Sequence, residues 1–267
     1  EAELWSIINN FSNDKNTAKL TKAAEYLIDN IAADDLADKL INNDFSDSAK
    51  RDLAFALSLS GHSDAENYLV DTLSSLSDSS SVGTNSDLQK VRLMVALSGN
   101  GQVSEYGFQA LDSLAKDPNE SSNVRNNALI NLGSTLQQMQ NQGQAPAGLA
   151  DQLISTLNQA IGGENSASTI LAAGNAKLDN LDQQIMSKLS SSNSKERYAA
   201  ATVLARNPDY NDDLIQHLSS EPSDLVNYAI LSNLDATNLS RQQKDRLLDC
   251  SSDTSPDITK VIHQLIQ

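Results

Sequence analysis

Apolar residues recur at helical spacing along almost the whole chain. Between residues 19 and 41, apolar residues such as Leu20, Leu27 and Ile31 recur in steps of three and four positions and so share one face of a helix. Charged residues such as Lys22 mostly lie off this face. No stretch shows the sustained period-two alternation with tight turns that predicts β-strands. The sequence therefore predicts an all-α fold.

A short segment also repeats, in which a polar residue is followed three positions later by a small or aliphatic one. Its first residues are spaced by 41, 33, 72 and 30 positions, at Arg51, Arg92, Arg125, Arg197 and Asn227. The interval of 72 is about two units, and a degenerate unit lies inside it at residues 166–175. Each segment is expected to begin a helix that ends near a turn-forming residue, at Gly61, Gly99, Gly133, Pro208 or Asp235.

A second helix is expected after each of these, over residues 65–76, 105–115, 149–161 and 212–218. One helix pair cannot bury its apolar face alone, so successive pairs must stack. We expect one domain over 1–267, with about six stacked pairs over 47–235 between capping helices at 1–46 and 236–267. Polar connections are expected at 77–87 and 137–148. The repeated arginine is expected to bind carbonyls or aspartates of the adjacent turn, or else to be solvated.

Three of these segments resemble the second helices of HEAT or armadillo-like repeats. They are LQKVRLMVALSGNG (88–101), SNVRNNALINLGS (122–134) and SKERYAAATVLARNP (194–208). The degenerate unit at 166–175 and the asparagine at position 227 depart from that pattern. The resemblance implies a right-handed α-solenoid that binds a protein or peptide on its surface. A glycine that follows Leu-Ser also resembles the helical module of lipovitellin-type lipid-transfer proteins, which implies a lipid- or small-ligand-binding alternative.

Charge narrows the class of partner. The chain has 19 Lys and Arg against 35 Asp and Glu, a net charge of −16, which disfavours binding to nucleic acid or to an anionic membrane. No apolar run is long enough to span a bilayer. Such a surface favours a basic protein partner whose binding weakens with salt. Residues 126–176 hold only Asp151 and Glu164 as charged residues, which composition drift explains most simply and a contact surface explains alternatively.

The residue types that carry chemistry are sparse. His62, His217 and His263 are far apart in sequence, and one cysteine, Cys250, is too few to complete a zinc site with them. Cys250 has Asp249 beside it, and an adjacent anion does not activate a thiol. We therefore expect structural or solvated roles for these residues.

The segment from Asp209 to Asp213 has the first oxygen spacings of a calcium loop, but Leu214 replaces its glycine and Ser220 its last glutamate. Helix capping by Asn211 and the acids after it is the preferred interpretation. The sequence thus predicts a non-enzymatic interaction scaffold with no catalytic, cofactor or metal site. Abundant serine and asparagine with few cations lean toward a periplasmic or secreted setting.

Overall fold

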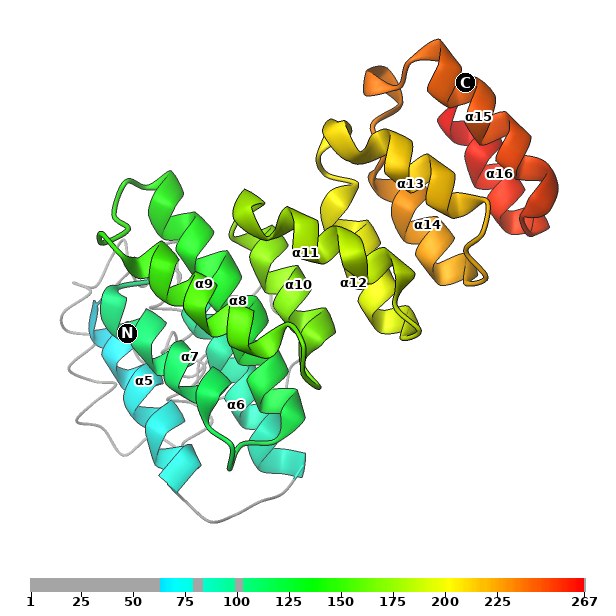
Figure 1. The fold of residues 1–267 in the computed structure, drawn as a ribbon. Coiled ribbons are helices and arrows are strands. Elements are labelled where there is room, and N and C mark those ends of the chain that lie inside the picture. Colours follow the sequence, from blue (N-terminus) through cyan, green and yellow to red (C-terminus); the bar gives the residue numbers. More distant parts are fainter. Residues whose placement is uncertain (1–62, 79–83, 99–102, 267) are drawn as a thin grey trace, which may run out of the picture. The chain divides into compact units, whose positions relative to one another are not determined.

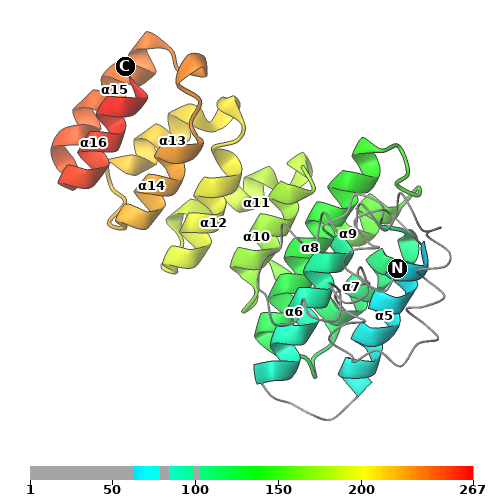
Figure 2. The same ribbon diagram turned by 180° about the vertical axis from the view of Figure 1, so that it is seen from behind.

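The structure, a computed structural model, describes residues 63–78, 84–98 and 103–266. These residues form twelve α-helices and no strand, so the all-α prediction is confirmed for them (Figures 1 and 2). The helices are α5 (Ser63–Asp78), α6 (Thr84–Ser98), α7 (Glu105–Lys116), α8 (Ser122–Asn141), α9 (Leu149–Ala160), α10 (Ser166–Asn175), α11 (Asp182–Ser187), α12 (Ser194–Leu204), α13 (Asn211–Leu218), α14 (Asp224–Asn233), α15 (Arg241–Cys250) and α16 (Pro256–Leu265).

Five single-turn 3₁₀ helices lie beside them, η1 (Asp179–Leu181), η2 (Lys188–Ser190), η3 (Pro208–Tyr210), η4 (Ala236–Asn238) and η5 (Ser251–Asp253). The predicted capping helices at 1–46, the repeat segment at Arg51, its end at Gly61 and His62 lie outside the described residues.

The chain divides into two compact units, with the boundary inside α9 between Leu153 and Ile154. In the first unit α5 contacts α6 and α7, while α8 contacts α6 and α7. The main contacts of this unit thus join helices that are one or two positions apart in the chain. The helices share an apolar core whose largest fully buried side chains include Phe108, Met94, Leu111 and Leu132. The prediction of one domain over 1–267 stays a prediction.

The second unit has the same order of contacts. Helices α10, α12, α14 and α16 pack on one another in succession, and Figures 1 and 2 show this row. Helices α11, α13 and α15 each pack on the next even-numbered helix, and α13 also contacts α15. Small residues let the even-numbered helices approach closely. A Cβ on Gly174 of α10 would lie 2.7 Å from Val203 Cγ1 of α12, closer than real Cβ contacts allow.

Serine and asparagine side chains begin many of the helices. The Ser104, Ser121, Asn193 and Ser255 side chains each accept a backbone N–H in the first turn of the following helix. Ser240 and Gln243 form a reciprocal capping box at the start of α15. Helix capping thus accounts for part of the high serine and asparagine content. The composition that favours a periplasmic or secreted setting therefore has a structural explanation as well.

The repeat segments were placed correctly in three of the four described cases. Arg125, Arg197 and Asn227 are each the fourth residue of their helix, in α8, α12 and α14. Arg92 is instead the ninth residue of α6, because that helix begins at Thr84 within the predicted 77–87 connection. The degenerate unit at 166–175 coincides with α10, and the four predicted second helices correspond to α5, α7, α9 and α13.

Two predicted boundaries in the middle of the chain were wrong. Helix α8 does not end near Gly133 but continues to Asn141, so the connection after it covers 142–148 rather than 137–148. A glycine inside a helix costs about 1 kcal/mol relative to alanine. By continuing past the glycine the helix gains more than that, because it buries Leu136 and Met139 almost completely. The predicted ends near Gly99, Pro208 and Asp235 agree with the ends of α6, α12 and α14.

Candidate functional site

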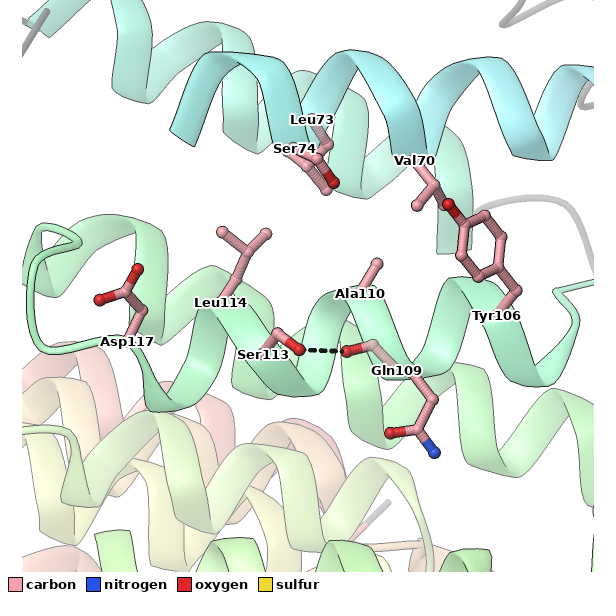
Figure 3. A pocket seen from close by; sticks show the side chains of 9 residues that line it. All are labelled: Val70, Leu73, Ser74, Tyr106, Gln109, Ala110, Ser113, Leu114 and Asp117. Atoms are coloured by element: carbon pink, nitrogen blue, oxygen red, sulfur yellow. Dashed lines mark hydrogen bonds between the residues drawn. The ribbon is translucent and has the colours of Figure 1, made fainter. Parts of the chain in front are cut away.

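A groove lies between α5 and α7 on the surface of the first unit. It has a volume of about 360 Å³ and is lined by Val70, Leu73 and Ser74 from α5 and by Tyr106, Gln109, Ala110, Ser113, Leu114 and Asp117 from α7 and its C-cap. Figure 3 shows the aliphatic side chains of the two helices facing each other along the middle of the groove. The lining is therefore apolar at the centre and polar at both ends.

One end of the groove carries an exposed tyrosine next to a carboxylate. The Tyr106 side chain is about half exposed, and its hydroxyl donates to Asp71 Oδ1 at 3.2 Å. Desolvation and the neighbouring Asp71 carboxylate both raise the pKa of the Tyr106 phenol. The phenol therefore stays protonated and keeps donating to Asp71 at neutral pH.

The opposite end carries a second carboxylate. Asp117 is the C-cap of α7, and its Oδ1 accepts the backbone N–H of Asn119 at 2.8 Å. Figure 3 shows Asp117 and Tyr106 at opposite ends of the view. None of the nine lining residues is basic.

Polar contacts fix α7 in place beside this groove. Glu66 of α5 accepts hydrogen bonds with one carboxylate oxygen from the Ser104 N–H, the Ser104 hydroxyl and the Gly107 N–H, at 2.8, 2.9 and 3.1 Å. A carboxylate at a helix N-terminus also interacts favourably with the helix dipole. The side-chain amides of Gln109 on α7 and Gln152 on α9 also form two reciprocal hydrogen bonds, each amide nitrogen donating to the oxygen of the other. The walls of the groove are thus held rigidly.

A second, smaller groove crosses the even-numbered helices of the second unit. Its volume is about 200 Å³, and it is lined by Ala167 and Leu171 of α10, Ser194, Lys195, Tyr198 and Ala199 of α12 and Leu225 of α14. Leu225 is 63% exposed, and Tyr228, one helical turn further along α14, is 53% exposed. Side chains of this size are unusual on a solvated face and form an apolar surface together.

Two buried ion pairs connect neighbouring helices in the same way. Lys90 Nζ of α6 lies 2.7 and 2.8 Å from the carboxylate oxygens of Glu120, in the turn before α8. Arg197 of α12 donates to both carboxylate oxygens of Glu221, in the turn before α14, at 2.8 and 2.9 Å. In each pair a cation on an even-numbered helix binds the glutamate that precedes the next even-numbered helix.

Glu221 is the centre of the larger of these two networks. Besides Arg197, it accepts the Ser223 N–H at 2.9 Å and lies 2.9 Å from His217 Nε2. Burial raises the pKa of the Glu221 carboxyl, but the hydrogen bonds from Arg197, Ser223 and His217 outweigh it and leave the pKa lowered. These contacts connect α12, α13 and the turn before α14.

The expected role of the repeated arginine is confirmed at Arg197. Its guanidinium donates to the carbonyls of Ser191 and Ser192 in the adjacent turn, in addition to Glu221. The acid is a glutamate of the next turn rather than an aspartate of the same one. Asn227, which occupies the equivalent position in α14, donates to the Glu221 carbonyl at 3.2 Å and so serves the same turn.

The structure places the other singled-out residues far from any common site. His217 lies in the last turn of α13 and pairs with Glu221, whereas His263 is exposed in the last turn of α16. Cys250 is buried at the end of α15, with Sγ 3.8 Å from the Ile215 carbonyl.

Asp212 and Asp213 lie in the first turn of α13, but Asn211 does not cap this helix. Tyr210 is the N-cap residue and makes no side-chain capping bond, while Asn211 is buried as the first helical residue. The Tyr210 hydroxyl instead donates to Asp182 at 2.7 Å, and this hydrogen bond, with burial and nearby acids, raises the pKa of Tyr210 to about 12.

Within the described residues, no three His, Cys, Asp or Glu side chains are close enough together to hold a metal ion. None of the described helices is long and apolar enough to cross a membrane. Searches with protein-family models and of curated protein sequences gave no match to this chain.

Proposed function

We propose that the chain is a non-enzymatic, HEAT-like α-solenoid scaffold that binds a protein or peptide partner on its surface. The observation that carries this proposal is the order of helix contacts: within each unit, the main contacts join helices that are one or two positions apart in the chain. Stacked helix pairs of this kind form extended concave surfaces, and repeat proteins use such surfaces to bind their partners.

Two features of the surface support a binding role. A groove lies between α5 and α7 in the first unit, and another crosses α10, α12 and α14 in the second. Exposed Leu225 and Tyr228 border the second groove, and aromatic and large aliphatic side chains are the usual anchors of protein interfaces.

Small-angle scattering tests the solenoid part of the proposal. A compact globule of this length has a radius of gyration of about 18 Å. A solenoid is longer in one dimension, so we expect a clearly larger radius of gyration. We also expect a pair-distance distribution with a long tail, so that the maximum dimension is large compared with the most frequent distance. A radius near the globular value would contradict the solenoid.

A binding experiment tests the functional part. The immobilised full chain is expected to retain a defined protein that, once identified and purified, forms a complex of fixed stoichiometry in size-exclusion chromatography with light scattering. Failure to retain such a protein at any salt concentration would count against a scaffold. Native mass spectrometry of the purified chain provides the contrast, because a co-purified lipid would favour the carrier alternative.

A further inference from the structure

We propose that the groove between α5 and α7 is the docking site for a basic amphipathic helix of the partner. The inference rests on the proposed scaffold function and names the site and the chemistry of the segment that it binds. Its basis is the combination of an apolar centre, a carboxylate at each end and the lack of a basic residue among the nine described residues that line it.

The centre of the groove fits aliphatic side chains. Val70 and Leu73 of α5 and Leu114 of α7 form its floor and are almost completely buried, while Ala110 of α7 is more accessible (Figure 3). Ala110 is half-buried, so its small side chain leaves room above the floor. An amphipathic helix that lies along such a groove inserts residues spaced three and four apart.

The ends of the groove determine the charge of the occupant. Asp117 lies at one end, and the Asp71 carboxylate, bound by Tyr106, lies at the other. A Lys or Arg at the second end would meet both this carboxylate and the exposed ring of Tyr106, whose face attracts cations. The net charge of −16 adds a long-range attraction for a basic segment.

The separation of the two ends sets the spacing of the cations. Tyr106 and Asp117 are eleven residues apart on α7, which corresponds to about 16 Å along the helix axis. Two cations about eleven residues apart on a helical partner would reach both carboxylates at once. Leucines at three- and four-residue spacing between them would face the centre of the groove.

A synthetic peptide tests this arrangement directly on the full chain. The probe is a helix-forming peptide of about 16 residues, with lysines about eleven residues apart and leucines on one face between them. One control peptide replaces both lysines by glutamate, and another places them about four residues apart. Fluorescence anisotropy is expected to show one-to-one binding of the probe only, weakening several-fold between about 50 and 300 mM salt.

Matched variants of the protein locate the binding. Ala110→Arg fills the groove and adds a positive charge, and we expect it to reduce affinity for the probe about tenfold or more. Asp117→Asn keeps the acceptor for the Asn119 N–H but removes the charge, and an approximately threefold loss is expected. Asp245→Asn, an exposed acid on α15 with the same charge change, is expected to leave affinity unchanged. Circular dichroism checks that each variant is folded.

The outcomes separate this inference from the scaffold function. Equal binding of the glutamate peptide, equal effects of Asp117→Asn and Asp245→Asn, or no binding of the probe would overturn the docking site. So would a wild-type dimer that Ala110→Arg dissociates, because a second copy would then cover the groove. If a protein partner is captured and binds Ala110→Arg as tightly as wild type, the groove inference fails and the scaffold function stands.

Discussion

At the scale of single residues, burial decides which charges matter for stability. The Glu221 side chain has no exposed area and binds three donors, whereas Asp212 is 66% exposed where it binds Arg246 at 2.8 Å. Removing one partner of a buried pair leaves an uncompensated buried charge, while an exposed pair contributes little. Asp212 lies in the first turn of α13 and Glu221 lies just after the end of the same helix, so the two acids form a natural comparison.

We expect Glu221→Gln to lower the free energy of unfolding by about 3 kcal/mol, because Arg197 would stay buried without its counter-ion. Asp212→Asn is the control and is expected to change it by less than about 1 kcal/mol. Urea unfolding of the full chain, followed by circular dichroism, measures both. Equal effects of the two variants would show that the buried network is not a stabilising element.

The lowered pKa of Glu221 also predicts a pH dependence. A carboxyl with a folded-state pKa below its unfolded value stabilises the protein above the unfolded value, about 4.3, and loses this contribution as the pH falls through the folded one. The wild-type free energy of unfolding should therefore fall more steeply than that of Glu221→Gln between about pH 5 and 3. The difference between the two curves is the measurement, since other acids titrate in both proteins. Parallel curves would contradict the assignment.

At the scale of helices, the sequence predicts where a helix begins better than where it ends. Periodicity and capping place the starts of α7, α9, α10 and α13 within a residue, because both signals are local. The end of α8 was missed, because burial of residues beyond Gly133 outweighs the local cost of glycine. The bond of Arg197 to the adjacent turn was foreseen, but the Lys90–Glu120 pair was not, since neither residue stands out in the sequence.

The candidate grooves could not be predicted from sequence for a related reason. Val70 and Ala110 lie forty positions apart, and each belongs to an ordinary apolar stripe. Only packing of α5 against α7 makes them face one another. The one available signal is the exposed tyrosine that follows the Ser104 cap, and it is too common a feature to single out a site.

Close packing of α10 on α12 gives a prediction at this scale. Gly174→Ala would place a methyl group against Val203, and overpacking of this kind costs about 1 to 3 kcal/mol. Val203→Ala in the same chain is expected to recover part of the loss by making room. Gly162→Ala is the control, because a Cβ there would meet nothing within 4 Å. Thermal unfolding of the four proteins tests this, and no loss in Gly174→Ala would show that the helices can separate freely.

At the scale of the whole molecule, stability is expected to be a sum over neighbouring helix pairs. The described contacts connect each helix with those one or two positions away, and the chain forms two compact units. In such architectures a local weakness affects nearby elements more than distant ones.

Hydrogen exchange followed by mass spectrometry can detect that behaviour. We expect Glu221→Gln to accelerate amide exchange most in α12, α13 and α14, which meet at the Glu221 network. Exchange in α6, α7 and α8 should change much less, because these helices belong to the other unit. Uniform acceleration over all described helices would instead indicate one cooperative unit.

The two buried ion pairs also restrict how such a chain can change during evolution. In both, the cation and the glutamate come from successive helix pairs, as with Lys90 and Glu120. Deleting or duplicating one helix pair would place a buried charge opposite a neighbouring helix pair that lacks the residue of opposite charge. Helix pairs bearing these residues are therefore not interchangeable, and gain or loss of units is tolerated best where no such bond crosses the junction.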